Sequence, residues 1–262
     1  MSTIELSGSQ YLYAKPEALH SENHSELKFV ANDQLVAKVG AVNAVPLLVG
    51  EFVQAMHHFP IVFGGPEKTP MAILGLQEGQ NLFLKDGRFE AGVYVPAYLR
   101  RYPFTLAGTD TDDFVVCIDR EAPGFSEGDE GEALFKDKEL TEFTKGAINF
   151  LNEYEAERKR SNAFVKQLID ADLLEVKHTL ALNGNGEQRE VIAEYYGVAE
   201  ERLRALPDAQ LAEMVRQGLV TAVDAHLLSL KQWDALIARR DGVAKGQVED
   251  LDQFKKSFER KK

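Results

Sequence analysis

The chain has 262 residues, of which 44% are hydrophobic and 27% charged, a composition typical of a globular protein and unlike a disordered one. Its formal net charge of −12 argues against broad binding to nucleic acid or anionic membranes, because both need a basic surface. The single cysteine, Cys117, excludes a disulfide framework within the chain and a multi-cysteine zinc site, which fits a reducing compartment.

Residues 1–23 are polar and irregular, and we expect them to form an arm laid over a domain. They lack the basic segment and apolar core of a secretory signal, and no apolar run in the sequence reaches the roughly 18–20 residues of a membrane span. We therefore expect a cytoplasmic protein, or one exported without a signal. His20 and His24 are one helical turn apart, but no third ligand accompanies them, so we predict surface histidines and no metal.

The next elements are short. Residues 26–42 mix strand-forming residues with a turn at Asn32-Asp33, which predicts two short strands. Pro46 suits a first helical turn, and apolar residues at helical spacing predict an amphipathic helix over residues 47–59. Glu51 falls near the middle of that helix, either on an exposed or paired flank or as a buried functional carboxylate.

Two apolar segments, residues 60–63 and 71–76, predict strands of a sheet that is covered on both faces. Gly75 within the second segment indicates a bulge or a close approach of the backbone. Residues 81–91 then predict a hairpin, because Asp86-Gly87 favours a type I′ turn. In that register Leu84 faces Phe89, and the apolar face would hold Leu82, Leu84, Phe89 and Ala91.

A short helix follows the hairpin. Pro96 opens it and Pro103 closes it, and it carries Tyr98, Arg100 and Arg101. Neighbouring arginines on a helix cannot both face one way, so one of them could simply pair with an acidic residue to hold the segment in place.

The second half is richer in helix. A strand at residues 114–119 and an acidic loop precede the longest helical pattern, residues 140–170. The loop contains GFSEG around Ser126, but the helix that a hydrolase nucleophile elbow requires is missing, which argues against a catalytic serine. Further elements are expected as strands at residues 173–182 and 191–198, and as helices at residues 200–206, 208–217 and 232–239.

Residues 219–230, LVTAVDAHLLSL, are ambiguous, and their β-branched start favours a strand. Asp224 and His226 would then share one face. A histidine–carboxylate pair can serve in acid–base chemistry or in a metal site, but two groups complete neither, and a structural hydrogen bond is the simpler interpretation.

The pattern as a whole predicts an α+β fold, with a mixed or antiparallel sheet with hairpins, one long central helix and several short helices. We divide the chain into an arm at residues 1–23, a domain at 24–240 and a polar tail at 241–262.

Several segments together resemble the SapC-like family, bacterial proteins named for an association with surface layers. The likeness covers residues 24–240 and is carried by His24, Asn43-Ala44-Val45-Pro46, Glu51-Phe52, FPIVF at 59–63, LGL at 74–76, QNLF at 80–83, Asp86-Gly87-Arg88, YVPAYLRRYPF at 94–104, ALF at 133–135, RLRALP at 202–207 and AHLLSL at 225–230. One departure is Phe89, where the family usually has a tryptophan.

The resemblance implies no settled catalytic residues and no cofactor. It implies a link to surface-layer systems, and similar proteins are often encoded near tryptophan-halogenase-like proteins, cupin-like proteins and TonB-dependent receptors. We therefore expect an accessory or binding protein that acts with a protein partner.

The alternative is an enzyme acting on a small carboxylate or aromatic molecule, or on a peptide. Arginines suit carboxylates and tyrosines suit aromatic groups. The candidate binding residues are Asn81, Tyr94, Tyr98, Arg100 and Arg101, with Glu51, Asp224 and His226 as weaker candidates.

Overall fold

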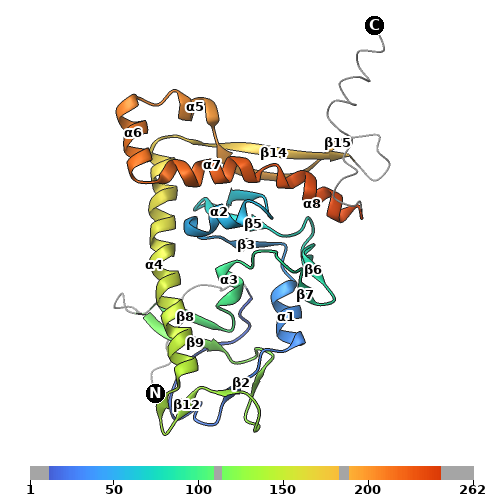
Figure 1. The fold of residues 1–262 in the computed structure, drawn as a ribbon, viewed down its shortest axis with the longest axis vertical. Helices are drawn as coiled ribbons and strands as arrows, with labels where there is room; N and C mark the ends of the chain where they lie inside the picture. Colours follow the sequence, from blue (N-terminus) through green and yellow to red (C-terminus); the bar gives the residue numbers. More distant parts are fainter. Residues whose placement is uncertain (1–11, 109–113, 183–188, 243–262) are drawn as a thin grey trace.

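The structure is a computed structural model that describes residues 12–108, 114–182 and 189–242. Over these ranges it has an α+β fold of antiparallel strands, one long helix and several short helices, which confirms the predicted fold class (Figure 1). The long helix α4 (Glu142–Asp170) runs beside the small strands at one end of the molecule and reaches the large sheet at the other.

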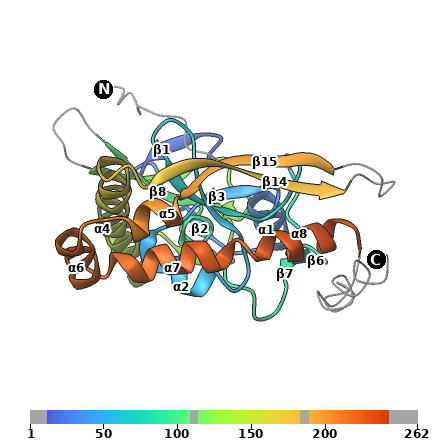
Figure 2. The ribbon, with the colours of Figure 1, turned by 90° about the horizontal axis from the view of Figure 1, so that it is seen from above.

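The large sheet has five strands, each antiparallel to its neighbours, in the order β14 (Leu174–Leu182), β15 (Arg189–Val198), β4 (Ile61–Gly64), β5 (Thr69–Ile73) and β3 (Ala44–Pro46). Ile61 and Phe63 of β4 are fully buried, as the unbroken apolar run predicted. Helices α7 (Leu219–Ser229) and α8 (Gln232–Arg240) follow one another alongside the β14–β15 hairpin (Figure 2).

The smaller sheets lie toward the other end of α4. They are β1 (Pro16–Ala18), β9 (Phe114–Asp119) and β8 (Phe104–Gly108); β10 (Phe125–Ser126), β2 (Lys28–Phe29) and β11 (Glu132–Ala133); and the pair β12 (Phe135–Lys136) with β13 (Glu139–Leu140). Because β1 pairs with β9, residues 16–18 of the N-terminal segment form part of a sheet.

Two hydrophobic clusters form the core, and α4 contributes to both. Its Leu151 is buried in the smaller cluster, beside Phe104 and Leu134, whereas its Phe164 and Leu168 belong to the larger one. The side chain of Thr141 caps the start of α4 by accepting the Thr144 N–H. The helix therefore fixes the two ends of the molecule relative to each other.

The predicted hairpin is confirmed as β6 (Leu84–Lys85) and β7 (Arg88–Phe89), with Leu84 opposite Phe89. Asp86 and Gly87 both have positive φ, at 52° and 73°, as a type I′ turn requires. The predicted apolar face was wrong in one respect, because Phe83 is buried at 3% exposure while Ala91 is exposed.

Two short elements differ from the prediction. The second strand expected within residues 26–42 is helix α1 (Asp33–Gly40), because the Asn32 side chain caps it by accepting the Leu35 N–H at 2.9 Å. Pro46 ends strand β3 and does not open a helix. The helix expected over residues 47–59 is reduced to a 3₁₀ turn η1 (Val49–Glu51) and α2 (Phe52–Ala55).

The strand expected over residues 219–230 was wrong, since this segment is helix α7. Gly218, at φ 74°, separates α7 from the preceding helices α5 (Glu200–Arg204) and α6 (Asp208–Arg216). The buried residues Ala222, Ala225 and His226 recur at helical spacing, and this buried face outweighs the β-branched start of the segment.

Candidate functional site

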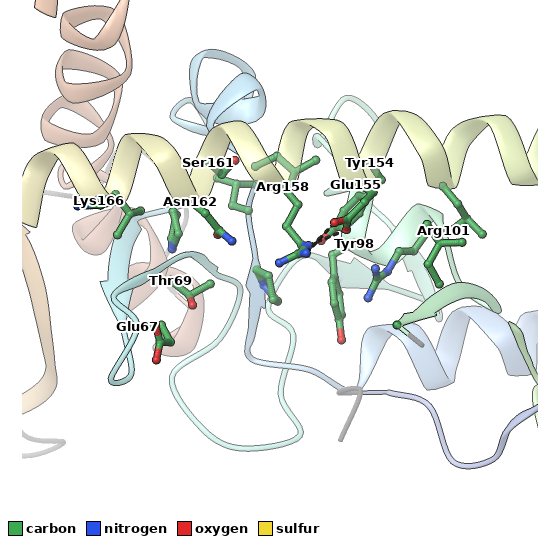
Figure 3. Close-up of a pocket in the computed structure, with 18 of the residues that line it drawn as sticks. Glu67, Thr69, Tyr98, Arg101, Tyr154, Glu155, Arg158, Ser161, Asn162 and Lys166 are labelled. Atoms are coloured by element: carbon green, nitrogen blue, oxygen red, sulfur yellow. Dashed lines mark hydrogen bonds and ion pairs between the residues drawn. The ribbon is translucent and has the colours of Figure 1, made fainter. Parts of the chain in front are cut away.

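A groove of about 880 Å³ opens between α4, the Pro46–Leu48 segment and the short helix α3 (Ala97–Arg100) (Figure 3). Pro96 starts α3 as predicted, and two of the predicted site residues, Tyr98 and Arg101, line the groove. Tyr98 is buried at 5% exposure, so its ring forms part of the wall and does not extend into solvent.

Arg101 lies between two aromatic rings. Its guanidinium carbon is 4.4 Å from the centre of the Tyr98 ring and 4.5 Å from that of Tyr154 on α4. Burial raises the pKa of Tyr154 to about 12, although the charge of Arg101 opposes this rise, so its hydroxyl stays protonated at neutral pH. Arg101 thus places a positive charge, flanked by two aromatic rings, at the groove.

Charged residues of α4 occupy another part of the groove. Arg158 donates two hydrogen bonds to Glu155, from Nε and Nη2, each at 2.7 Å (Figure 3). The hydrogen bond to Glu155 raises the pKa of Arg158 further, so this guanidinium is permanently charged. Its side chain is 46% exposed and lines the groove.

The rest of the lining is mixed. Its apolar part is formed by Pro46, Leu47, Leu48, Pro70, Leu106, Phe114, Leu151, Val165 and Ile169, and its polar part by Glu67, Thr69, Ser161, Asn162 and Lys166 (Figure 3). Ile169 is 48% exposed and Phe114 is 42% exposed, high values for large apolar side chains. The apolar part of this lining, together with the guanidinium groups of Arg101 and Arg158, is chemically suited to an anionic molecule with an apolar or aromatic body.

Glu51 lies in a hydrogen-bonded cluster that does not line this groove. Its Oε1 accepts the Tyr94 O–H and the Ala97 N–H, both at 2.7 Å, and its Oε2 accepts the Leu48 N–H at 2.9 Å. Glu51 is 5% exposed, so it is buried and does not lie on an exposed flank of the helix. Burial, followed by the hydrogen bond to Glu51, raises the pKa of Tyr94 to about 12.

Arg100 belongs to the same cluster and not to the groove. Its Nε donates to the Val95 carbonyl at 3.0 Å, and its Nη2 donates to the Tyr94 hydroxyl at 3.4 Å. The two neighbouring arginines therefore face different ways, as expected on a helix. Arg100 bonds to Tyr94 and Val95 within its own segment, residues 94–101, whereas Arg101 lines the groove.

Three further candidates, Asn81, Asp224 and His226, do not line the groove. Asn81 accepts the Phe83 N–H at 2.9 Å and so stabilises the turn before the hairpin. His226 is fully buried: its Nε2 accepts the Val198 N–H at 3.1 Å, and its Nδ1 lies 2.8 Å from the Ile61 carbonyl, to which a neutral ring donates. Asp224 is exposed, and the prediction that it shares a face with His226 was wrong, because α7 is a helix.

Sequence reasoning missed a second buried carboxylate, Asp119, at the end of β9. Its oxygens accept hydrogen bonds from the backbone N–H of Lys15 at 2.9 Å, the Tyr102 hydroxyl at 2.8 Å and Lys38 Nζ at 3.0 Å. Burial alone would raise the pKa of Asp119, but these hydrogen bonds outweigh it and lower the pKa. Asp119 anchors the start of the described chain, and no local motif marks it.

His24 is also buried, which corrects the prediction of a surface residue. Its Nδ1 accepts the His20 N–H at 2.9 Å, and its Nε2 lies 3.1 Å from Glu17 Oε1. Within the described ranges, no group of three or more His, Cys, Asp or Glu residues is placed to hold a metal ion. None of the helices in those ranges is both long enough and apolar enough to cross a membrane.

These features define an α+β protein with an arginine- and tyrosine-lined groove beside a buried carboxylate cluster. A family model described as SapC matches residues 19–236, and the chain therefore belongs to the SapC family, as the resemblance predicted. Searches of curated proteins and of solved structures give no match.

Proposed function

We propose that this SapC-family protein is an accessory binding protein whose groove holds an anionic ligand with an apolar or aromatic body. The observation that carries the proposal is the position of Arg101, whose guanidinium carbon lies within 4.5 Å of the ring centres of both Tyr98 and Tyr154 at the groove. Contact with two rings restricts the motion of a guanidinium, and a guanidinium can bind a carboxylate through two parallel hydrogen bonds. The apolar walls would cover the rest of the ligand.

Binding without turnover is favoured by the state of the buried histidines. His226 has one ring nitrogen accepting an N–H and the other facing a carbonyl, and His24 is similarly engaged on both sides. A general base must reach the proton that it removes, and these rings are directed into the protein. The carboxylate of Glu51 is likewise occupied by three donors.

The resemblance to SapC-like proteins suggests where such binding would be used. We place the protein beside surface-layer, TonB-dependent uptake or tryptophan-halogenase-like systems. In that setting the ligand is either a small molecule that these systems handle or a carboxylate-bearing segment of a partner protein.

The proposal is tested by calorimetry and thermal shift with phenylacetate, indole-3-acetate, free tryptophan and short peptides ending in an aromatic residue. We expect at least one of them to raise the melting temperature. Arg101→Lys keeps the charge but loses the planar donor pair, and Arg158→Ala removes the second guanidinium. Each should weaken binding by about tenfold or more, since a hydrogen bond to a charged group contributes about 1.5–3 kcal/mol.

Arg160→Ala is the matched control, because Arg160 is on the same helix and pairs with Glu157 as Arg158 pairs with Glu155, but it does not line the groove. It should bind as the wild type does. Binding that is equal in all three variants would contradict the assignment of the groove. Steady conversion of a bound compound would replace the binding role with the enzymatic alternative.

A further inference from the structure

Within the described ranges, strand β14 is an unusually long edge strand. It lies at the end of the five-stranded sheet and pairs with β15 along one side (Figure 2). It has 9 residues, whereas strands average about 5–6. Val176, His178 and Leu180 alternate along one face and are exposed, Val176 at 49% and Leu180 at 50%. A long edge strand with exposed apolar side chains is a template for pairing with another strand.

The hydrogen-bond pattern shows which backbone groups of β14 face outward. The Ala199 N–H donates to the Leu173 carbonyl at 2.8 Å, just before β14 begins. Antiparallel pairs alternate between hydrogen-bonded and non-hydrogen-bonded, so Leu174, Val176 and His178 direct their N–H and C=O groups away from β15.

Two side-chain contacts agree with this alternation. The N–H of Val198, which lies opposite Leu174, points away from β14 and donates to His226. The outward carbonyl of Leu174 accepts from Arg202 at 3.0 Å. Beyond Leu174, no described strand pairs with the outer edge of β14. The register shift after Thr179 places the additional residue on β15. The alternation along β14 is therefore unbroken, and Leu180 also directs its N–H and C=O groups away from β15.

We propose that a second copy of this chain adds to this edge, with β14 of the two copies antiparallel around a two-fold axis at His178. In this register Val176 lies opposite the partner's Leu180, which buries both apolar side chains. On the other face Lys177 lies opposite the partner's Thr179. A shift that centres the pair on Lys177 would place it against the partner's Lys177, and like charges directly opposite are destabilising.

The arrangement closes after two copies. A two-fold interface uses the same surface on both partners and leaves no free β14 edge. The opposite edge of the sheet is β3, which has three residues and ends at Pro46, a residue with no N–H to donate. The sheet therefore extends from five to ten strands and stops there.

The test is sedimentation equilibrium of the full chain. We expect an added strand pair to bury less area than the roughly 1,200–2,000 Å² of stable complexes. The monomer and the dimer should therefore be in equilibrium at protein concentrations of about 1–200 µM. His178→Pro removes an N–H that faces away from β15, so the hairpin should keep its circular dichroism while the protein becomes monomeric.

Val191→Lys is the matched control. Val191 lies opposite Leu180 on β15, is 58% exposed and belongs to the same face, but it is one strand removed from the edge. This variant should remain a dimer, whereas it would dissociate if the copies instead packed face to face.

A crosslink provides a second measurement. His178→Cys should give a disulfide-linked dimer on oxidation, because Cα atoms in a hydrogen-bonded pair are about 5.5 Å apart, within the range of disulfides. The native Cys117 is fully buried and should not compete. A monomer at every concentration would overturn the proposal, as would a dimer that survives His178→Pro and fails to crosslink at this position.

Discussion

Single buried polar residues set much of the chemistry of this protein. His226, Glu51 and Asp119 are each almost fully buried, and each is surrounded by hydrogen-bonding groups from distant segments of the chain. A buried polar group with its partners in place is stable, but it becomes costly when its charge changes or a partner is removed. The protonation state of His226 is therefore linked to folding.

Burial lowers the pKa of His226 from 6.5 to about 4. Between these values the unfolded chain binds a proton that the folded chain does not, so stability is complete above pH 6.5 and falls as the pH decreases toward 4. The expected loss is at most about 3–4 kcal/mol, because the pKa falls from 6.5 to about 4 and each tenfold change in the acid dissociation constant corresponds to about 1.4 kcal/mol. Asp119 adds to this loss of stability only at lower pH. Its folded pKa lies below the ordinary value of 3.8, so its stabilisation is complete above that value and is lost as the pH falls through the folded pKa.

Urea unfolding at pH 7, 5.5 and 4.5 measures this loss. The exposed His20 provides the control, since His20→Gln should leave the pH dependence unchanged. His226→Gln should be less stable at pH 7 and lose most of the slope between pH 6.5 and 4. A wild-type stability that stays flat over this interval would show that the ring is not held neutral.

At the scale of elements, close backbone contacts decide which glycines can be replaced. A Cβ added to Gly75 would lie 1.9 Å from the backbone oxygen of Gln80, which confirms the close approach that the sequence predicted. A Cβ added to Gly146, on the exposed surface of α4, would meet nothing within 4 Å. The same substitution should therefore have opposite effects at the two positions.

Gly75→Ala should lower the free energy of unfolding by about 1–3 kcal/mol, because backbone must move to make room. Gly146→Ala should raise it by about 0.5–1 kcal/mol, since alanine is the better helix former. Chemical denaturation of the two variants beside the wild type measures both signs. An unchanged free energy of unfolding for Gly75→Ala would contradict this prediction, since it would show that the backbone at Gln80 moves without cost.

At the scale of the whole molecule, α4 contributes buried residues to both hydrophobic clusters, and Phe29 and Phe125 pack against both. Leu151 lies in the smaller cluster, while Trp233, the single tryptophan of the chain, lies in the larger one. If α4 couples them, the protein unfolds in one transition and a cavity at one end destabilises the other.

Leu151→Ala should lower the unfolding midpoint reported by Trp233 fluorescence as much as the midpoint reported by far-ultraviolet circular dichroism. The expected cost is about 2–5 kcal/mol, the usual range for removing a buried leucine side chain. Two separate transitions, with the fluorescence midpoint unchanged, would show that the ends of the molecule fold independently.

Local patterns were enough to predict the α+β class, the long helix α4, the hairpin at Asp86-Gly87 and the short helix after Pro96. These features depend on periodicity and on the backbone preferences of glycine and proline, which act between near neighbours. The same signals failed where a local preference was weak, as in α7, where burial of one face determined the outcome. Asn32-Asp33 was predicted to be a turn between two strands, whereas the Asn32 side chain caps helix α1.

The sequence by itself determined the family and the segment that carries Tyr98 and Arg101, since both follow from residues in continuous order. Only the tertiary structure decided that Arg101 stacks against Tyr154, 53 positions along the chain, and lines a groove while Arg100 does not. It also decided that Glu51 is buried and that Asp119 accepts a hydrogen bond from the distant backbone N–H of Lys15. These contacts join distant segments, and their free energy depends on distances and burial that no local pattern encodes.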